Sequence, residues 1–481
     1  MKLAQLIKNL QIISISGSLD MEVSDVKTVE SSVTKDTLFV CLKGKDFDGH
    51  EFAKTAENYG ATAVIAEKEL DLSITTIIVK DCRKALAQIA AEFYDNPAEK
   101  MSLIGVVGTN GKTTTSHMLY QVLNAAGINC GVIGTLGTYF NDKFLEPTLT
   151  TPDPLELNKI LYDMYNSGVK TVVMEVSAHA IYWSKIFGLK FKAGIFTNLS
   201  RDHLDFFSNI EEYKKTKLSF FNNNACEYVV VNSDDEVGVE LASSIDGAIT
   251  YGLSNPADVF AIRVKEKDGK TGFVINLFDC IYRVEIPLVG RYNVSNALAA
   301  ATVASLIGVS TKKVASGLNE LTGVSGRLEK VYDKEFKVYV DYAHTPDGIK
   351  KVLEALRPIC KNRLIIVFGC GGNRDHGKRE EMGEIAKKYA DFVVITSDNP
   401  RFEDPMDIIN SIEKGVLKVG KEYVIVEDRA EGINYAINVA KEGDLIVVAG
   451  KGAENYQDVL GIKKPYNDKD TIEEIIYRRL S

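Results

Sequence analysis

The sequence has little of what several classes of protein need. Its seven cysteines contain no C-x-x-C pair, so we predict neither a zinc site nor a disulfide framework, and we expect reduced thiols in a cytoplasmic protein. No apolar run is long enough to cross a membrane, and the N-terminal Leu3, Leu6, Ile7 and Leu10 follow helical spacing, unlike a signal peptide. The formal net charge of −9 argues against general nucleic-acid binding, which needs a basic surface.

The composition is typical of a globular protein, and the chain is long. The 481 residues are 45% hydrophobic and 26% charged. At roughly 100–200 residues per domain, this length predicts about three domains. Residues 1–98 mix short strands with helices, whereas residues 99–327 and 328–481 alternate strands with helices. Such alternation predicts an α/β fold with parallel sheets covered on both faces, and the last segment resembles a doubly wound, Rossmann-like domain.

A glycine-rich turn follows the predicted strand Leu103–Gly108 and opens a helix that runs to about Ala126. It reads Gly-Thr-Asn-Gly-Lys-Thr-Thr, and its backbone amides and helix N-terminus suit a phosphate group. Val106 stands where the strict pattern has its first glycine, so Gly108 supplies the turn. We expect Lys112 to reach the β- and γ-phosphates of a nucleotide and Thr113 to bind Mg²⁺. The alternative is an ordinary strand–turn–helix corner.

Two further predicted strands end in polar side chains. Glu175 lies at the end of one, and His203 follows the end of another. Ligands in open α/β sheets bind at the carboxyl ends of strands, so these two residues are candidate metal ligands. Taken alone, each is more commonly a structural partner than a ligand, and Mg²⁺ prefers oxygen to imidazole.

These motifs resemble a known family. The glycine-rich loop is similar to that of the Mur ligases and the folylpolyglutamate synthetases, and the two strand-end segments resemble the Mur ligase magnesium site. The resemblance covers nearly the whole chain. It implies a three-domain architecture with a central P-loop ATPase-like parallel sheet: residues 1–98 would bind the uridine of a UDP-sugar, residues 99–327 would bind ATP, and residues 328–481 would form a Rossmann-like amino-acid-binding domain. It implies ATP and Mg²⁺ as cofactors.

The same resemblance implies a modified lysine. Tyr213-Lys214-Lys215-Thr216-Lys217 matches the family's Tyr-x-x-x-Lys helix segment, which places Lys217 at the carbamylated position. A carbamate turns a cation into an anion that can hold Mg²⁺. The implied metal ligands are Thr113, Glu175, His203 and Lys217 as its carbamate, and the implied catalytic residues are Lys112, Lys217, Glu175 and His203. The alternative is a solvated basic helix face, which is our interpretation of Lys214 and Lys215.

Other matched segments imply substrate contacts. The implied ATP-binding residues are Gly108, Thr109, Asn110, Gly111, Lys112, Thr113, Thr114, Asn293, Asn296, Arg327, Asp341 and His344. The implied contacts to the UDP-sugar substrate are Ser31, His50, Thr150, Thr151, Ser177 and Lys185. Four departures from the family lie here. Glu30 stands where it has an aspartate, and Ser32 and Lys185 stand where it has arginines. Trp183 stands where it usually has a glutamine. Lysine does not reproduce the planar, bidentate contact of arginine.

The C-terminal segment carries the specificity motif. Asp398-Asn399-Pro400-Arg401 is the form that marks addition of meso-diaminopimelate in the resembling tripeptide synthetases, where the arginine pairs with the distal carboxylate that lysine lacks. Arginine suits this task because its forked donors match a carboxylate. Ala453 replaces the family's histidine beside Glu454, and the alternative for Arg401 is a structural arginine in a turn. The implied amino-acid-binding residues are Arg374, Asp398, Asn399, Pro400, Arg401, Gly450 and Glu454.

The resemblance therefore implies an ATP-dependent ligase that adds meso-diaminopimelate to UDP-MurNAc-L-Ala-D-Glu through an acyl phosphate, in cytoplasmic peptidoglycan precursor synthesis. We expect a monomer that binds small molecules, without nucleic acid and without membrane insertion. Two alternatives stay open within the family, namely L-lysine as the added amino acid and a paralogue with a different carboxylate acceptor. A nucleotide-binding regulatory protein without turnover is a third. A dinucleotide dehydrogenase is disfavoured because no G-x-G-x-x-G opens either α/β unit.

Overall fold

The computed structural model describes residues 1–222, 225–267, 269–420 and 422–480. The chain divides into two compact units. The first comprises Met1–Gly105, Asn129–Lys192 and Ser219–Glu227, and the second comprises Val106–Ile128, Ala193–Leu218 and Tyr228–Ser481. The strands β6 (Ser102–Val107), β11 (Phe191–Phe196) and β12 (Cys226–Asn232) have residues in both units.

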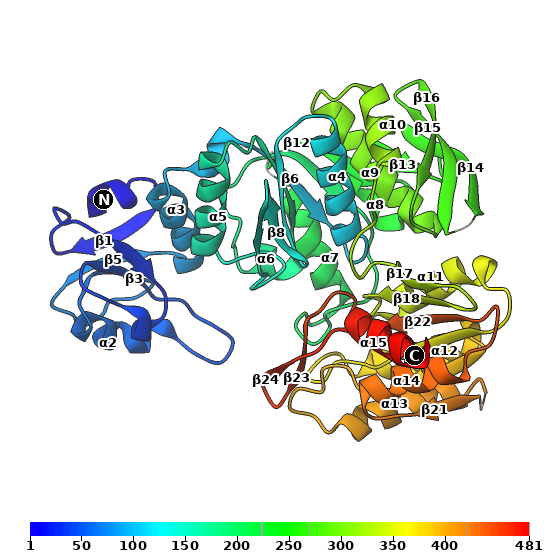
Figure 1. Cartoon of the computed structure of the whole chain (residues 1–481). Coiled ribbons are helices and arrows are strands. Elements are labelled where there is room, and N and C mark those ends of the chain that lie inside the picture. The colour runs from blue at the N-terminus through cyan, green and yellow to red at the C-terminus, as the bar shows by residue number, and fades with distance from the viewer. Residues whose placement is uncertain (223–224, 268, 421, 481) are drawn as a thin grey trace. The chain divides into compact units, whose positions relative to one another are not determined.

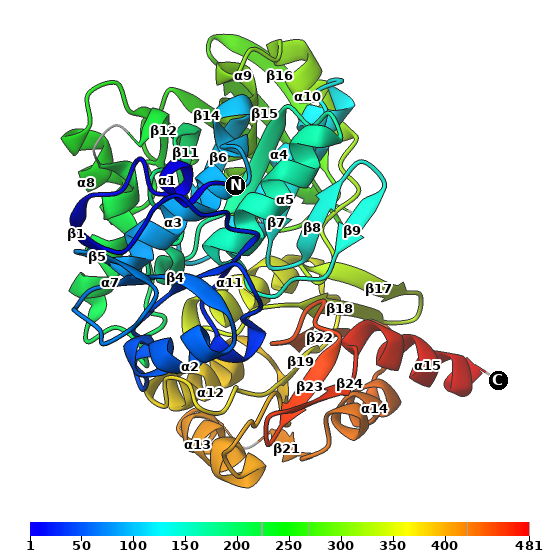
Figure 2. The same cartoon turned by 90° about the vertical axis from the view of Figure 1, so that its left-hand side faces the viewer.

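The N-terminal part of the first unit is a five-stranded sheet. Its strands are β1 (Ile12–Ser16), β2 (Asp25–Lys27), β3 (Thr37–Val40), β4 (Ala61–Ala66) and β5 (Thr75–Val79), and its helices are α1 (Leu3–Leu6), α2 (Ala53–Asn58) and α3 (Cys82–Phe93), with the 3-10 turns η1 (Glu30–Ser32) and η2 (Gly49–Phe52). The order is β1-β5-β4-β3-β2, and β1 alone runs antiparallel to its neighbour. Buried side chains of α1 and α3 pack on one face and those of α2 on the other. Figures 1 and 2 show α2 and α3 on opposite sides of this sheet. β4 contributes apolar side chains to both faces.

The first unit also contains a parallel strand pair with an antiparallel extension. These elements are β7 (Cys130–Gly134), β8 (Gly137–Phe140), β9 (Lys143–Leu145), β10 (Thr171–Glu175), α5 (Pro154–Asn166), α6 (Ala178–Tyr182) and the 3-10 turns η3 (Pro97–Lys100) and η4 (Ser219–Phe221). β10 pairs in parallel with β7, which continues through β8 to β9 as antiparallel hairpins. The polar end of β10 carries Glu175, which is fully buried.

The second unit begins with the helix that follows the glycine-rich turn. Its elements before residue 328 are α4 (Lys112–Ala125), α7 (Ile210–Leu218), α8 (Glu236–Ser244), β13 (Ile249–Gly252), β14 (Val259–Lys267), β15 (Lys270–Leu277), β16 (Cys280–Ile286), α9 (Arg291–Leu306) and α10 (Thr311–Asn319). β12, β13 and β14 pair in parallel, and β14, β15 and β16 form antiparallel pairs. Along β15 buried residues alternate with more exposed ones, as is typical of an antiparallel strand with one face on the core.

The C-terminal part of the second unit is a doubly wound sheet. Its elements are β17 (Glu329–Asp333), β18 (Lys337–Asp341), α11 (Pro346–Leu356), η5 (Arg357–Ile359), β19 (Leu364–Phe368), α12 (Gly377–Tyr389), β20 (Phe392–Ile395), α13 (Pro405–Leu417), β21 (Tyr423–Ile425), α14 (Arg429–Val439), β22 (Leu445–Ala449), β23 (Tyr456–Val459), β24 (Ile462–Pro465) and α15 (Asp468–Leu480). The six-stranded order is β17-β18-β22-β19-β20-β21, parallel except for β17. β23 and β24 form a separate hairpin.

Alternating side chains fix the two faces of this sheet. Leu364, Ile366 and Phe368 of β19 pack with α11, α12 and α13, whereas Ile365 and Val367 pack with α14 and α15. Figure 2 shows α12 and α13 on one side of the strands and α14 and α15 on the other. A strand that is apolar on both faces is typical of a parallel sheet, and it leaves the strand ends as the place for polar loops.

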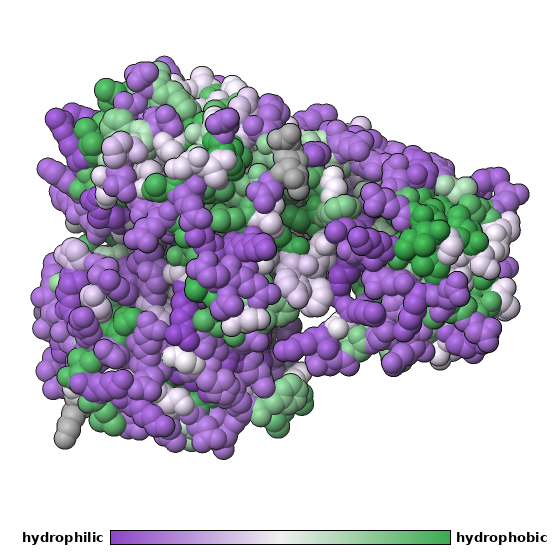
Figure 3. All heavy atoms as spheres, turned by 180° about the vertical axis from the view of Figure 1, so that it is seen from behind, coloured by the Kyte–Doolittle hydropathy of each residue, from purple (hydrophilic) through white to green (hydrophobic). Residues whose placement is uncertain are grey.

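One face of the molecule is mostly polar. Figure 3 shows a face on which hydrophilic residues predominate, with hydrophobic ones in smaller groups between them. Within the part of the chain that the structure describes, no helix has both the length and the apolar character that crossing a membrane requires. The N-terminal helix expected from Leu3 to Leu10 is a single turn, because only Leu3–Leu6 is helical.

Candidate functional site

The glycine-rich loop of the second unit joins β6 to α4, as the sequence predicts. Gly108 has φ +154° and Gly111 has φ +85°, which side chains rarely adopt. A Cβ on Gly108 would lie 1.8 Å from Thr197 Oγ1, and a Cβ on Gly111 would lie 2.6 Å from Asn296 Oδ1. Glycine is therefore required at both positions, and the loop amides stand at the head of α4, where an anion is stabilised.

The asparagine after β11 holds this loop in place. Asn198 Oδ1 accepts from the Asn110 amide at 3.0 Å, and Asn198 Nδ2 donates to the Asn110 carbonyl at 3.0 Å. Thr197 Oγ1 donates to the same carbonyl at 2.7 Å. The backbone around Asn110 is thus fixed by side chains before any ligand binds, which lowers the entropic cost of binding.

Two lysines converge on the carbonyl side of the loop. Lys112 Nζ donates to the carbonyls of Gly108 at 2.9 Å and Thr109 at 2.8 Å, and Lys217 Nζ donates to that of Gly108 at 2.6 Å. Lys217 comes from α7 and is 1% exposed. Burial, and then the charge of Lys112, hold the pKa of Lys217 well below its usual range. A lowered pKa makes the neutral, nucleophilic form of an amine easier to reach.

An arginine and an aspartate from later in the chain also contact the loop. Arg327 NH2 donates to Thr113 Oγ1 at 2.8 Å, and its guanidinium stacks 4.4 Å from the ring centroid of Tyr342. Asn110 Nδ2 donates to Asp347 Oδ2 at 3.0 Å. The structure therefore brings Arg327 to the expected phosphate site.

Beside this site, two imidazoles and one ammonium group lie near the buried carboxylate of Asp202. Its oxygens lie 3.4 Å from His203 Nε2, 3.9 Å from His344 Nε2 and 3.9 Å from Lys378 Nζ. Burial would raise the pKa of Asp202, but the imidazoles and the ammonium outweigh it and hold that pKa below its usual range. Burial and Lys378 lower the pKa of His344. His203 has φ +56°, a strained conformation typical of functional loops.

Three further residues expected to bind ATP are fully engaged in the fold. Asp341 accepts from the amides of Leu328 and Ala343 at 2.7 Å each, and burial raises its pKa although Arg327 opposes the rise. Asn296 Oδ1 accepts from Thr115 Oγ1 at 3.2 Å, while Asn293 Nδ2 donates to the Val289 carbonyl at 2.8 Å. Asn296 thus lies against the phosphate loop, and Asn293 is turned to its own helix start. Thr114 is buried in α4.

Two loops at the C-terminal ends of β20 and β22 interlock. Asn399 Nδ2 donates to Glu454 Oε2 at 3.0 Å, and Lys451 Nζ donates to Asn399 Oδ1 at 3.0 Å and to Glu454 Oε2 at 2.9 Å. The Asn399 oxygen also accepts from the Asp458 amide at 2.9 Å. The structure therefore brings together Asn399 and Glu454, which the sequence placed in one amino-acid site.

Arg401 is held in an unusual backbone conformation. Its φ is +54°, its amide donates to the Asp458 carbonyl at 3.0 Å, and its carbonyl accepts from the Leu460 amide at 2.8 Å. NH1 donates to the Gly372 carbonyl at 2.8 Å, and Nε lies 3.9 Å from Asp458 Oδ2. Arg374 lies 3.9 Å from Asp205 and is half exposed. The fold thus orients Arg401 in part, and among the described residues no carboxylate lies within ordinary hydrogen-bonding distance of its guanidinium.

In the first unit, Glu175 anchors a small polar network. Its Oε1 accepts from the Thr135 amide at 2.8 Å and its Oε2 from Thr135 Oγ1 at 3.2 Å. Thr135 Oγ1 lies 3.2 Å from that of Thr150, and Thr151 Oγ1 donates to the Glu175 carbonyl at 2.8 Å. The Ser177 amide donates to Thr151 Oγ1 at 3.0 Å. Four residues singled out in the sequence therefore lie together.

The remaining residues expected to contact the sugar nucleotide have varied surroundings. Lys185 pairs with Asp153 at 2.8 Å. The guanidinium of Arg83 stacks over the ring of Trp183, with Cζ 3.9 Å from the ring centroid. His50 has a fully buried ring, which contacts the Asp48 carboxylate and accepts from the Glu67 amide at 2.9 Å. Ser31 is exposed in η1. Both ring nitrogens of His50 are thus used within the fold, while Ser31 is accessible.

The candidate metal ligands are divided between the units. Thr113, His203 and Lys217 belong to the second unit and Glu175 to the first. Among the described residues, no group of three or more histidine, cysteine, aspartate or glutamate side chains could hold a metal ion. A divalent cation suits this set only if Lys217 becomes an anion, since an ammonium beside Lys112 would repel it.

Sequence reasoning missed several residues that shape these sites. Asn198 and Asp202 stand in the polar segment directly after β11, so their position at a strand end was the available signal. Lys378 and Lys451 were not among the expected site residues, yet they are 7% and 0% exposed. Burial of a lysine depends on distant packing, which a local motif does not show.

A phosphate loop at the head of a helix, in a parallel α/β fold with polar loops at the strand ends, defines the class of nucleotide-binding α/β enzymes. Profiles of three domains match the chain: the Mur ligase family catalytic domain over residues 30–94, the Mur ligase middle domain over 106–304, and the Mur ligase glutamate ligase domain over 326–452.

Full-length relatives agree with this assignment. A protein named UDP-N-acetylmuramoyl-L-alanyl-D-glutamate–2,6-diaminopimelate ligase 1, from Clostridium acetobutylicum, is 42% identical over 99% of both chains, and the similarly named ligase of Clostridium tetani is 39% identical over 99% of both. A solved structure of a ligase of the same name has a TM-score of 0.71 at 30% identity, covering 100% of this chain and 99% of that one. The chain belongs to the Mur ligase family, and the predicted α/β class with three-domain architecture is confirmed.

Proposed function

We propose that this protein is the ATP-dependent ligase that adds meso-diaminopimelate to UDP-MurNAc-L-Ala-D-Glu in peptidoglycan precursor synthesis. The observation that carries the proposal is the alignment of the whole chain, at 42% identity, with a protein named as a diaminopimelate ligase. The local chemistry supports it, because the phosphate loop suits ATP and Arg401 suits a carboxylate.

The first step activates a carboxylate. A γ-carboxylate oxygen of D-glutamate attacks the γ-phosphorus of ATP, the bond to the β,γ-bridging oxygen breaks, and ADP leaves an acyl phosphate behind. We assign Lys112 and Arg327 to the negative charge that spreads over the transferring phosphoryl group. The loop amides from Gly108 to Thr114 cradle the phosphates, and Asn293, Asn296, Asp341 and His344 complete the nucleotide site.

The second step forms the amide. The neutral amine of diaminopimelate attacks the acyl carbon, the tetrahedral intermediate releases phosphate, and a proton leaves the nitrogen. We assign Glu454 and Asn399 to the amino end of the amino acid and Arg401 with Arg374 to its distal carboxylate. Catalysis then rests mainly on positioning and charge neutralisation.

A metal belongs to this account. We propose that Thr113, Glu175, His203 and carbamylated Lys217 hold Mg²⁺, which when bound would neutralise phosphate charge. The depressed pKa of Lys217 supports its carbamylation, since only a neutral amine can attack carbon dioxide. The carbamate forms a new N–C bond, and the amine loses one proton.

We also propose the domain limits, the location and the state of association. Residues 1–98 bind the uridine, residues 99–327 bind ATP, and residues 328–481 bind the amino acid. Ser31, His50, Thr150, Thr151, Ser177 and Lys185 contact the UDP-sugar substrate. The protein acts as a monomer in the cytoplasm, where its small-molecule substrates are found.

A second acceptor remains a distinct candidate because of one contact. Lys185, which stands where the family has an arginine, is engaged with Asp153 at 2.8 Å. A paralogue that joins an amino acid to another carboxylate would explain such a change. The amine specificity is a separate question, with L-lysine as the competitor.

The test is phosphate release together with the mass of the product. Protein, ATP, Mg²⁺ and UDP-MurNAc-L-Ala-D-Glu are mixed with either meso-diaminopimelate or L-lysine. Tripeptide formed only with diaminopimelate supports the proposal. Product with lysine alone overturns the amino-acid assignment, and absence of product with both amines overturns the acceptor assignment.

A further inference from the structure

Two loops carry the candidate amino-acid site, and they follow β20 and β22, the strands on either side of β19. The loop after β20 contains Asn399 and Arg401, and the loop after β22 contains Lys451 and Glu454. Asn399 connects the two loops through hydrogen bonds to Lys451 and Glu454. The position of each loop also depends on the position of the strand end from which it leaves. Ala449 is the last residue of β22, and Ser397 lies two residues after the end of β20.

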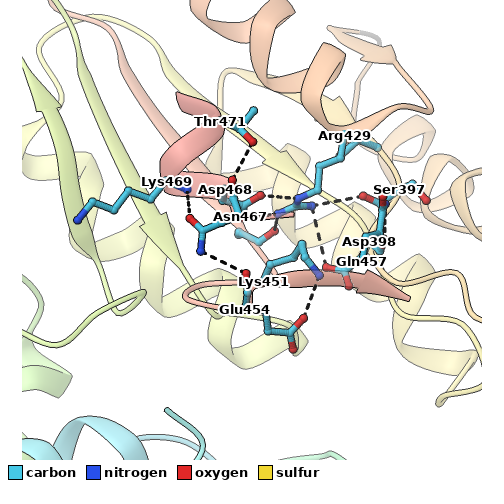
Figure 4. Close-up of polar contacts among 12 residues, drawn as sticks. Ser397, Asp398, Arg429, Lys451, Glu454, Gln457, Asn467, Asp468, Lys469 and Thr471 are labelled. Carbon is cyan, nitrogen blue, oxygen red and sulfur yellow. Dashed lines mark hydrogen bonds and ion pairs between the residues drawn. The ribbon is translucent and has the colours of Figure 1, made fainter. Parts of the chain in front are cut away.

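A buried arginine joins the two strand ends. Arg429 is the first residue of α14, and its side chain is fully buried. NH2 donates to the Ala449 carbonyl at 3.0 Å, and NH1 donates to the Ser397 carbonyl at 3.5 Å. NH1 also lies 4.0 Å from Asp398 Oδ2, at the start of the first loop (Figure 4).

The same guanidinium holds the chain that returns to the sheet. Nε and NH2 each donate to one oxygen of Asp468 at 2.8 Å, a bidentate pair in which both side chains are fully buried. Asp468 begins α15, where the helix dipole also stabilises a negative charge. Figure 4 shows Arg429 between Asp468 on one side and Ser397 on the other.

The segment between Glu454 and Asp468 is the hairpin of β23 and β24, which borders Arg401. Val459 forms a parallel bridge with Arg401. The far end of the hairpin is fixed beside Asp468, where Asn467 Nδ2 donates to the Glu454 carbonyl at 3.3 Å. The Arg429 guanidinium therefore connects the starts of both loops with the end of the hairpin that flanks the site.

A buried ion pair is a poor device for stability alone, since well-packed apolar residues often replace such a pair without loss. Such a pair specifies geometry instead, because the N–H donors of a guanidinium have fixed directions and few arrangements of the acceptors fit them. We propose that Arg429 and Asp468 are positioning residues of the amino-acid site, setting the distance between Arg401 and Glu454. This inference rests on the proposed function, in which those two residues hold opposite ends of meso-diaminopimelate.

The chain offers a matched control in the same sheet. Arg363 makes a bidentate contact with Asp444, in which Nε donates to Oδ1 at 3.4 Å and NH2 donates to Oδ2 at 2.6 Å. This pair joins the residues that precede β19 and β22, at the opposite ends of the strands. It resembles the Arg429 pair chemically but lies away from both loops.

The experiment measures KM for meso-diaminopimelate and for ATP, together with Tm, in Asp468→Asn, Arg429→Lys and Arg363→Lys. We expect KM for diaminopimelate to rise about tenfold in the first two, with KM for ATP changed by less than about twofold. Arg363→Lys lowers Tm and leaves both KM values near wild type. The double variant Arg429→Met with Asp468→Leu recovers Tm without recovering KM.

Hydrogen exchange makes the test independent of catalysis. We expect faster amide exchange in residues 398–401 and 451–460 of Asp468→Asn, and not in Arg363→Lys. Unchanged KM and unchanged exchange in Asp468→Asn overturn the inference, as does an equal rise of KM in Arg363→Lys. If the wild type forms no tripeptide, the proposed function fails, and the exchange comparison alone decides whether the pair positions the loops.

Discussion

Lys217 shows at the scale of one residue how function can oppose stability. Burial depresses its pKa, so the folded protein binds fewer protons than the unfolded chain. This cost is absent above the unfolded pKa of about 10.4 and grows as pH falls toward the folded pKa. In buffer free of carbon dioxide, we expect Lys217→Met to stabilise the protein by about 1 kcal/mol or more at pH 7 while abolishing ligation.

Thermal unfolding from pH 6 to pH 10 checks this expectation. The gain in Lys217→Met is largest at pH 6 and shrinks toward pH 10. Lys214→Met is the control, because Lys214 lies on the same helix but pairs with Glu240 at the surface. Destabilisation by Lys217→Met at every pH would contradict the assignment of a neutral buried amine.

The recognition of meso-diaminopimelate is proposed to depend on one side chain, that of Arg401. Replacing it with alanine removes the proposed partner of the distal carboxylate, so kcat/KM for meso-diaminopimelate should fall about 100-fold or more. Arg357→Ala, which breaks a surface pair with Asp391 in the same segment, should leave it unchanged. Steady-state kinetics with both amines measures the effect, and an equal loss with L-lysine would argue for a structural arginine.

At the scale of elements, the glycine-rich loop depends on backbone conformation at the head of α4. Gly111→Ala meets both an unfavourable φ of +85° and the Asn296 oxygen, so we expect nucleotide binding to weaken about tenfold or more. Gly127 follows the other end of the helix, has φ +87°, and has nothing within 4 Å of an added Cβ. Gly127→Ala should therefore cost about 1 kcal/mol of stability and leave nucleotide binding intact.

Calorimetric titration with ATP compares the two variants directly. If Gly127→Ala weakened nucleotide binding as much as Gly111→Ala, strain anywhere in the helix would explain the result. The close approach of Asn296 to the loop would then not be needed to explain the weaker nucleotide binding of Gly111→Ala.

Elements with strong local signals were predictable from the sequence. Runs of mainly apolar and β-branched residues predict strands at Ala61–Ala66 and at Lys337–Asp341, and β4 and β18 have these bounds. β17 and the hairpin of β23 and β24 were not predicted, because their residues are partly or fully exposed and lack a clear period. The pair of Arg429 with Asp468 was equally hidden, since its members are 39 residues apart and carry no motif.

Within the second unit, Asp202 connects segments that are distant in sequence, because His344 and Lys378 both approach its carboxylate. Its pKa is lowered, so the contribution to stability is present above the unfolded pKa of about 3.9 and is lost as pH falls through the folded value. We expect Asp202→Asn to lower Tm by about 2–4 °C at pH 7.

The comparison is made by thermal unfolding between pH 3 and pH 8. The difference between wild type and Asp202→Asn should narrow at the acid end. Asp205→Asn is the control, because Asp205 is exposed and lies 3.9 Å from its arginine. An equal effect of both variants would mean that general surface charge is responsible.

The whole molecule is assigned as a ligase that activates a carboxylate with ATP, and oxygen transfer tests that claim most directly. UDP-MurNAc-L-Ala-D-Glu labelled with ¹⁸O in its γ-carboxylate is ligated to meso-diaminopimelate, and the released phosphate is analysed by mass spectrometry. The acyl-phosphate account predicts one ¹⁸O in each phosphate, because the bridging oxygen leaves with phosphorus. Unlabelled phosphate would contradict it, since ATP would then be cleaved by water without activating the carboxylate.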